Sequence, residues 1–185
     1  MVLIGFMGAG KSSIGRALGQ KLGWAFEDLD DRIERREQRK VSEIFRDLGE
    51  SGFRQAEYAA LKDLLGELKP GAEKIIALGG GTFAQKNNVR LIESTHVPTV
   101  FLDADVTELW RRCRQQAEEQ GTERPLLGSA QSFRELYEAR RLHYAKASFI
   151  QETVGKTVEE IATVLVEALD LDGKRRRQRQ RRGEK

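Results

Sequence analysis

A glycine-rich stretch near the N-terminus carries the residue types that bind phosphate. The stretch from Gly5 to Ser12 fits the pattern G-x-x-x-x-G-K-[ST]. Its glycines allow the backbone to curl until successive N–H groups point at one anion. Lys11 can reach the β- and γ-phosphates of a nucleotide, and the Ser12 hydroxyl can bind Mg²⁺. The stretch therefore predicts binding of a nucleoside triphosphate, with contacts from Gly8, Ala9, Gly10, Lys11, Ser12 and Ser13.

The segments on both sides of this stretch support the prediction. Residues Val2–Ile4 are apolar, as expected at the end of a buried strand. On the other side, Ile14, Leu18 and Leu22 recur at every fourth position, which is typical of one face of a helix. A strand, a glycine-rich loop and a helix form the context in which such a motif binds phosphate. The alternative, a glycine-rich turn that binds nothing, is disfavoured by these flanks.

Length and composition limit the classes of protein that the chain can belong to. Its 185 residues suit one domain with a sizeable core. No apolar run approaches the roughly 20 residues that a membrane span needs. Met1 leads directly into the first predicted strand, so we expect no signal peptide. Cys113 is the only cysteine, which excludes an internal disulfide and suits a reducing compartment. We therefore expect a cytoplasmic protein with no membrane partner.

The positive net charge comes from the C-terminal end alone. Eight Lys and Arg residues and one Glu lie between positions 174 and 185, so this segment carries +7 and the remainder carries −4. A basic segment that is nearly free of apolar residues is expected to be disordered. It could bind nucleic acid, but a solvated end is the better interpretation. We therefore predict one monomeric domain over residues 1–171, followed by a basic tail at 172–185.

Short apolar strands alternate with amphipathic helices along the chain. The predicted strands span residues 2–4, 24–30, 75–78, 97–102 and 149–150. This alternation is typical of a parallel sheet with helices on both faces. From Gln115 to Arg124 the residues are polar apart from Ala117 and Gly121, which favours a flexible loop over the site.

Five short sequence motifs follow the phosphate-binding stretch in order. They are Asp28-Leu29-Asp30 at the end of the second predicted strand, Phe53–Glu57, Gly79–Gly81 after the third strand, Arg124–Leu127, and Arg140 with Tyr144 four residues later. Alternate residues of a strand share a face, so two carboxylates are expected on one side. Glycines at the carboxyl end of a parallel strand lie where ligands bind in open sheets.

This ordered set resembles the shikimate kinase family over roughly residues 1–171. The resemblance implies an α/β fold: a P-loop NTPase-type three-layer sandwich with a five-stranded parallel sheet flanked by helices and a flexible lid at about 112–127. It also implies phosphorylation of the 3-hydroxyl of shikimate by ATP, giving shikimate 3-phosphate and ADP on the route to chorismate. ATP, Mg²⁺ and shikimate are the ligands that it implies.

The resemblance assigns the substrate-binding residues. It places the carboxylate of shikimate on Arg54 and Arg140, the ring hydroxyls on Asp30, and the ring beside Gly80. Guanidinium groups suit a carboxylate because their planar forks donate two parallel hydrogen bonds. Arg54 could instead form a surface pair with Glu57, three residues along the same helix.

Two of these assignments have close competitors in the sequence. Arg141 adjoins Arg140, and Leu142 stands where the family often has proline, so Arg140 is preferred on its spacing to Tyr144. Similarly, Asp31 is easily confused with Asp30.

The two carboxylates also have a structural alternative. Asp30 is the candidate acceptor of the proton from the attacking hydroxyl, and Asp28 would lie near Mg²⁺, together with Ser12. An Asp pair after a strand could equally cap the following helix.

Positive charge around the γ-phosphate is expected to carry most of the catalysis, because phosphoryl transfer has a loose transition state. Lys11 and Mg²⁺ supply two positive centres, and the resemblance adds Arg124, delivered when the polar loop closes. Arg112 is the candidate that stacks on adenine, with Arg111 and Arg114 as alternatives. The catalytic residues predicted are Lys11, Asp30 and Arg124.

Two other functions fit parts of the sequence. A kinase of another small hydroxy-acid, such as gluconate, would keep the phosphate-binding stretch but would not need Arg54, Gly80 and Arg140 together. A nucleotide-binding regulator without kinase activity would need none of the predicted substrate residues.

Overall fold

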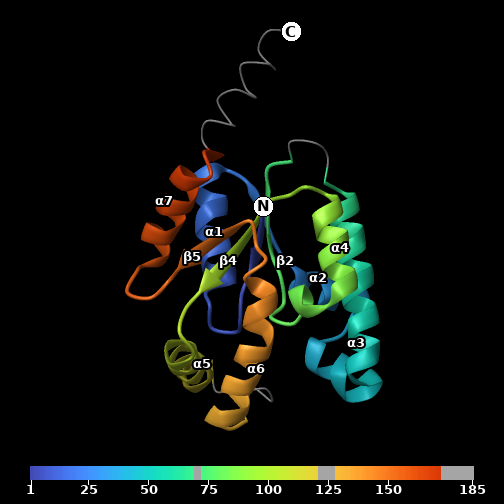
Figure 1. The fold of residues 1–185 in the computed structure, drawn as a ribbon. Coiled ribbons are helices and arrows are strands. Elements are labelled where there is room, and N and C mark those ends of the chain that lie inside the picture. The colour runs from blue at the N-terminus through green and yellow to red at the C-terminus, as the bar shows by residue number, and fades with distance from the viewer. Residues whose placement is uncertain (69–71, 121–127, 172–185) are drawn as a thin grey trace.

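The computed structural model describes residues 1–68, 72–120 and 128–171, drawn in colour in Figure 1. Arg124, the rest of the predicted lid from 121 to 127 and the basic tail at 172–185 lie outside the described residues. Within them, the strands form one sheet in the order β2-β3-β1-β4-β5, and every neighbouring pair is parallel. The strands are β1 (Val2–Ile4), β2 (Ala25–Asp28), β3 (Lys74–Ala77), β4 (Thr99–Asp103) and β5 (Phe149–Glu152).

Helices connect the strands and cover both faces of the sheet. Helices α1 and α7 pack together, and α3 packs against α4 at the other side of the molecule (Figure 1). Right-handed crossovers between parallel strands require this division, because β1 to β2 runs in the opposite direction to the later connections. The helices described are α1 (Lys11–Leu22), α2 (Leu29–Glu37), α3 (Val41–Gly66), α4 (Lys86–Ser94), α5 (Val106–Gln120), α6 (Ala130–Tyr144) and α7 (Val158–Ala168), with a 3₁₀ helix η1 (Thr82–Ala84) after β3. The predicted three-layer α/β fold with a five-stranded parallel sheet is confirmed.

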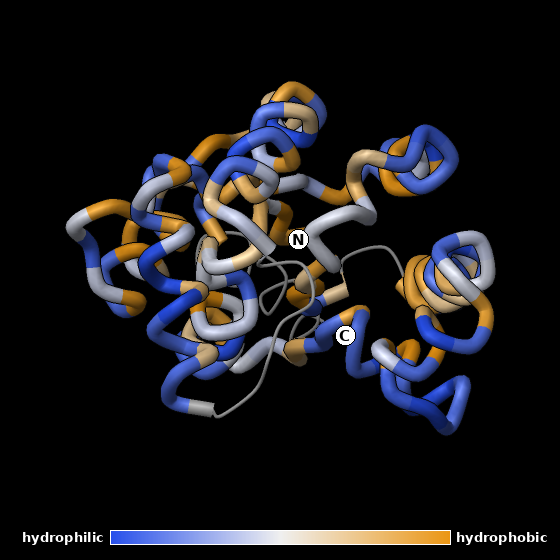
Figure 2. Tube along the Cα trace, turned by 90° about the horizontal axis from the view of Figure 1, so that it is seen from below, coloured by the Kyte–Doolittle hydropathy of each residue, from blue (hydrophilic) through white to orange (hydrophobic). Residues whose placement is uncertain are grey.

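The core follows the apolar pattern of the sequence. Strand β1 is wholly buried, and Ile14, Leu18 and Leu22 of α1 are buried against the sheet, as their spacing predicts. Burial of one such side chain contributes about 1.5–3 kcal/mol. Orange and blue residues alternate along the peripheral helices in Figure 2, as expected for helices with one buried face.

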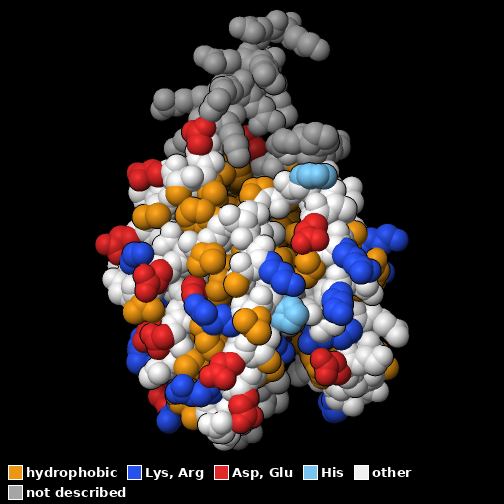
Figure 3. All heavy atoms as spheres, in the orientation of Figure 1, with side chains coloured by type: hydrophobic (Ala, Val, Ile, Leu, Met, Phe, Trp, Pro, Cys, Tyr) orange, Lys and Arg blue, Asp and Glu red, His pale blue; other side chains and the backbone are white. Residues whose placement is uncertain are grey.

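The surface mixes charges of both signs. Figure 3 shows Lys and Arg side chains interspersed with Asp and Glu over the face in view. Among the residues that the structure describes, no helix has the length and apolar character needed to cross a membrane.

The polar segment that was predicted to be a loop is partly helical in the structure. Residues 115–120 were expected in a flexible loop, but they continue α5 to Gln120. The reason is local: Gln, Ala and Glu are good helix formers, and polar pairs four residues apart support the last turns. These pairs are Arg114 with Glu118 and Gln115 with Glu119. The first part of the predicted lid is therefore helical.

The second predicted strand also ends earlier than expected. Strand β2 stops at Asp28, and Leu29 and Asp30 form the first turn of α2. The carboxylate of Asp28 accepts a hydrogen bond from the backbone N–H of Asp30 at 3.0 Å, so Asp28 is the N-cap of α2. The prediction that Asp28 and Asp30 share a strand face is wrong, and the capping alternative holds for Asp28.

Candidate active site

The glycine-rich loop between β1 and α1 has the backbone that its motif requires. Gly8 has a φ of 78°, a value that L side chains rarely adopt. A Cβ at this position would also lie 2.9 Å from both Cys113 Sγ and the Leu109 carbonyl oxygen of α5. Helix α5 therefore supports the loop from behind, and glycine alone fits at the contact.

The Lys11 ammonium lies over this loop. Its Nζ donates hydrogen bonds to the carbonyl oxygens of Gly5 at 3.0 Å and Phe6 at 2.9 Å. Burial lowers the pKa of Lys11, while the carboxylates of Asp30 and Asp28 act in the opposite direction. The geometry thus holds one partly buried cation at the N-terminus of α1, where the helix dipole also favours an anion.

Ser12 and Asp28 form a pair of oxygen donors beside Lys11. The Ser12 hydroxyl donates to Asp28 Oδ2 at 2.7 Å, across the gap between α1 and β2. Hydroxyl and carboxylate oxygens are the ligands that Mg²⁺ prefers, usually alongside water and phosphate oxygens. No group of three or more His, Cys, Asp or Glu residues suited to a metal ion occurs in the described ranges. The pair therefore fits a magnesium ion that arrives with a nucleotide, because the phosphates and water would complete its coordination.

Asp30 lies beside Lys11 and Asp28 and is half-buried. Burial raises the pKa of its carboxyl to about 6, the adjacent Asp28 carboxylate adds to the rise, and Lys11 opposes it. Asp31, the competitor noted in the sequence, is exposed. The first turn of α2 thus turns only Asp30 of the two toward the phosphate-binding loop.

These groups line one cavity of about 430 Å³. Its walls come from the glycine-rich loop, the junction of β2 and α2, the glycines after β3, and the middle of α5. The lining residues are Met7, Gly8, Gly10, Lys11, Ser12, Ser13, Asp28, Asp30, Leu78, Gly79, Gly80, Arg112 and Gln116. Ala9 is buried behind the loop. Gln116 was not predicted, because it falls in the segment expected to be a loop; its only signal is the spacing of four residues from Arg112.

Each of the three glycines after β3 lies close to one predicted substrate residue. A Cβ at Gly79 would lie 2.8 Å from Asp30 Oδ1. A Cβ at Gly80 would lie 3.6 Å from Arg140 Nη1, and a Cβ at Gly81 would lie 2.6 Å from Arg54 Nη2. Residues from α2, α6 and α3 are thus brought to one short stretch of backbone, where a Cβ would crowd Asp30 at Gly79 and Arg54 at Gly81 but would make only an ordinary contact with Arg140 at Gly80.

Arg54 makes the pair with Glu57 that the sequence left open, but the pair is not on the surface. Arg54 Nη1 donates to both carboxylate oxygens of Glu57 at 3.1 and 3.0 Å, and Glu57 is 1% exposed. The other edge of the guanidinium, Nε and Nη2, contacts the exposed carboxylate of Glu50 at 3.3 and 3.1 Å. The pair with Glu57 therefore orients the guanidinium of Arg54. Its Nε and Nη2 atoms face the more exposed side, where Glu50 lies.

The structure separates Arg140 from its neighbour Arg141. The guanidinium of Arg140 lies near Gly80 and 5.8 Å from the centre of the Phe6 ring. Arg141 is half-exposed and pairs with Asp103 at 3.0 Å. Tyr144 is fully buried and donates from its hydroxyl to the Gly80 carbonyl oxygen, and burial raises its pKa to about 12. The spacing from Arg140 to Tyr144 thus places both residues at the same glycine.

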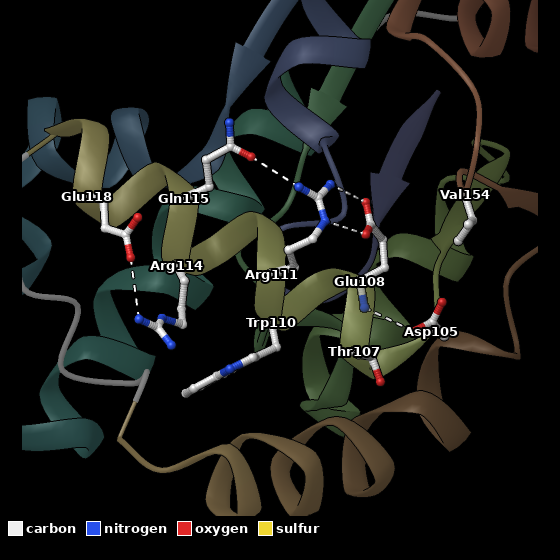
Figure 4. Close-up of a pocket in the computed structure, with 9 residues that line it drawn as sticks. All are labelled: Asp105, Thr107, Glu108, Trp110, Arg111, Arg114, Gln115, Glu118 and Val154. Atoms are coloured by element: carbon white, nitrogen blue, oxygen red, sulfur yellow. Dashed lines mark hydrogen bonds and ion pairs between the residues drawn. The ribbon is translucent and has the colours of Figure 1, made fainter.

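Of the three arginines considered for adenine, Arg112 alone lines the cavity of the glycine-rich loop within the described chain. Its guanidinium is fixed by Glu108 Oε1 at 2.7 Å and by the hydroxyl and carbonyl oxygens of Thr153, both at 3.2 Å. Arg111 and Arg114 lie along a second groove of about 570 Å³ beside α5 (Figure 4). There Arg111 pairs with Glu108 and Gln115, and Arg114 pairs with Glu118.

The chain matches one protein family over most of its length. A family model described as shikimate kinase covers residues 7–170. A shikimate kinase of Ruegeria pomeroyi is 39% identical over 173 residues, covering 91% of this chain and 84% of the relative. The structure of a shikimate kinase from Acinetobacter baumannii in complex with shikimate matches with a TM-score of 0.81 and 29% identity, covering 92% of each chain.

A gluconokinase from Sinorhizobium meliloti matches less well. Its TM-score is 0.58 and its identity 21%, with 92% of this chain and 95% of the other covered. This likeness shows a shared fold alone. The family model, the similar relative and the geometry of the site agree: the chain belongs to the shikimate kinase family.

Proposed function

We propose that the protein transfers the γ-phosphoryl group of ATP to the 3-hydroxyl of shikimate, producing shikimate 3-phosphate and ADP. One observation carries this proposal beyond family membership. The glycines after β3 bring together a carboxylate, Asp30, and two guanidinium groups, Arg54 and Arg140, beside the phosphate-binding loop. A substrate that satisfies this arrangement needs hydroxyls and one carboxylate on a compact frame.

The proposed reaction begins with the substrate held by its carboxylate. Arg54 and Arg140 come from different helices, so a ring bound between them has a fixed orientation. Its 3-hydroxyl would face Asp30, which accepts the hydroxyl proton as the oxygen attacks the γ-phosphorus and ADP leaves. With a pKa of about 6, the Asp30 carboxyl is mostly ionised at pH 7 and able to accept that proton.

Fixed cations would stabilise the negative charge on the γ-phosphoryl group during its transfer. Lys11 would lie against the β- and γ-phosphates, and backbone N–H groups of the loop would hold the phosphate oxygens. Magnesium, held by Ser12 and by Asp28, would supply further positive charge to the phosphate oxygens. Arg124 is proposed as a further cation, and Arg112 as the adenine contact.

Remaining expectations belong to the same proposal. We propose ATP with Mg²⁺ as the phosphate donor, a cytoplasmic monomer as the working form, and no nucleic-acid partner for the domain, with the basic tail as the one segment that could bind nucleic acid. The single domain over residues 1–171 and its basic tail also stay predictions.

An ADP-coupled assay with shikimate, quinate and gluconate tests the choice of substrate. We expect turnover with shikimate to exceed turnover with both other acids, because it alone matches the predicted carboxylate and hydroxyl contacts. Gluconate as the fastest substrate would contradict the proposal, and ADP release that no acid stimulates would favour a nucleotide-binding regulator.

Replacing Arg140 with alanine should raise the KM for shikimate about tenfold or more, since a charged hydrogen bond to the carboxylate is lost. The KM for ATP should stay within about twofold, because Arg140 lies at Gly80 on the substrate side. Initial-rate kinetics with each substrate varied measures both constants. Arg141→Ala is the matched control, since Arg141 pairs with Asp103 instead. A larger effect of Arg141→Ala on the KM for shikimate would reverse the assignment.

A further inference from the structure

Glu57 is a buried carboxylate whose partners extend beyond Arg54. It is 1% exposed, and a buried charge is costly unless all its oxygens are hydrogen-bonded. The Thr82 hydroxyl donates to Glu57 Oε1 at 2.7 Å, and Asn88 Nδ2 donates to Glu57 Oε2 at 3.3 Å. Each carboxylate oxygen thus accepts from Arg54 and from one neutral side chain, which fixes the plane of the carboxylate.

The two neutral donors are themselves joined and buried. Thr82 is 0% and Asn88 is 2% exposed. Asn88 Nδ2 also donates to the Thr82 carbonyl oxygen at 3.1 Å, and the Thr82 N–H donates to the Gly79 carbonyl oxygen at 3.1 Å. The network therefore connects α3, η1 and α4 to the glycine stretch on which the proposed substrate residues converge.

We propose that Thr82 and Asn88 are positioning residues for recognition of the substrate carboxylate. They hold Glu57 in one orientation, Glu57 holds Arg54 Nη1, and the guanidinium is thereby fixed against Gly81. Because both oxygens of Glu57 are committed to this network, a substrate carboxylate would meet the Nε and Nη2 edge of Arg54, where it would replace the exposed carboxylate of Glu50. This inference rests on the proposed function, since it assigns Arg54 to shikimate.

The test removes each donor in turn, with little change in volume at Thr82 and with loss of the whole carboxamide at Asn88. Thr82→Val deletes the hydroxyl, and Asn88→Ala deletes the amide. Each variant should raise the KM for shikimate about tenfold, the order expected when a hydrogen bond to a charged group is lost. The KM for ATP should stay within about twofold, because the network does not contact the phosphate-binding loop. Thr82→Ser, which keeps the hydroxyl, should restore most of the affinity for shikimate.

Asn87 provides a matched control. It is the adjacent residue of the same type on α4, but its side chain is exposed. Asn87→Ala should leave both KM values unchanged. Equal effects of Asn87→Ala and Asn88→Ala would overturn the proposal.

A second readout separates positioning from loss of stability. The second readout uses an analogue of shikimate in which a primary alcohol replaces the carboxylate, so that the ligand offers Arg54 no anion. Calorimetry in the presence of ADP should give the same affinity for this analogue in the wild type and in Thr82→Val. If Thr82→Val weakens shikimate and the alcohol equally, the network has a structural role only and the proposal is wrong.

The same assays distinguish this failure from failure of the proposed function. A wild-type protein that does not phosphorylate shikimate refutes the function itself. A wild-type protein that is active, with Thr82→Val and Asn88→Ala both retaining its KM for shikimate, refutes the positioning role alone.

Discussion

Lys11→Ala should lower kcat by a factor of about 10² to 10³, the usual cost of removing one fixed charge or donor from a transition state. The ammonium is held over the loop by the carbonyl oxygens of Gly5 and Phe6, so its position is set before the nucleotide arrives. No reorganisation is then required as charge develops on the equatorial oxygens. Steady-state kinetics at saturating ATP and shikimate measures the effect.

The control for this substitution lies in the same helix. Lys21 is exposed in the last turn of α1, and Lys21→Ala should leave kcat unchanged. Thermal unfolding and ADP binding of Lys11→Ala report whether the loop is still formed, because the substitution removes two hydrogen bonds to loop carbonyls. A folded Lys11→Ala variant that keeps most of the wild-type kcat would contradict the mechanism.

Asp30→Asn should lower kcat by a factor of about 10² to 10⁴, as expected for loss of a general base. The amide keeps the volume and a hydrogen-bonding oxygen, but it cannot take the proton from the 3-hydroxyl. Asp31→Asn is the matched control, since Asp31 is exposed on the next position of α2 and should not affect kcat. An Asp30→Asn variant with wild-type kcat would limit Asp30 to a role in binding.

The raised pKa of Asp30, about 6, adds a pH dependence to this prediction. In the wild type, kcat/KM for shikimate should rise between pH 5 and 7 with a midpoint near pH 6, because only the ionised carboxyl accepts a proton. A profile that is flat over this range would argue against Asp30 as the base.

Stability should change with pH in the opposite sense to activity. The pKa of Asp30 is higher in the folded protein than in the unfolded chain, so folding favours the protonated form. The stabilisation is fully present below the unfolded pKa of about 3.8 and is lost as the pH rises through about 6. Asp30→Asn removes this titration, so the difference between its melting temperature and that of the wild type should grow from about pH 4 to pH 6 and level off above about pH 7. Thermal melts across this range measure the difference.

Some of the site could be predicted because its chemistry is local in sequence. The loop from Gly5 to Ser12 is contiguous, and its glycines, lysine and serine act through the backbone of that one segment. The order of the strands and helices likewise follows from apolar spacing, as the buried Ile14, Leu18 and Leu22 of α1 illustrate.

The sequence alone could not decide which of two adjacent residues in a helix contributes to the site. Successive residues of a helix point about 100° apart, so one of two neighbours can face the cavity while the other meets solvent. Which one does so depends on how the helix packs against distant segments. Packing brought Asp30 rather than Asp31 of α2, and Arg112 rather than Arg111 or Arg114 of α5, to the cavity. It placed Arg140 rather than Arg141 of α6 beside Gly80.

The sequence by itself determined the phosphate-binding loop, the alternation of strands and helices, and the family. Tertiary structure alone decided that Glu57 is buried and that Thr82 and Asn88 meet it from two other elements. It also decided that Asp30, Arg140 and Arg54 each lie at one of three successive glycines. The physical reason is that these contacts join residues far apart in the chain, and only the packing of helices on the sheet sets the distances between them.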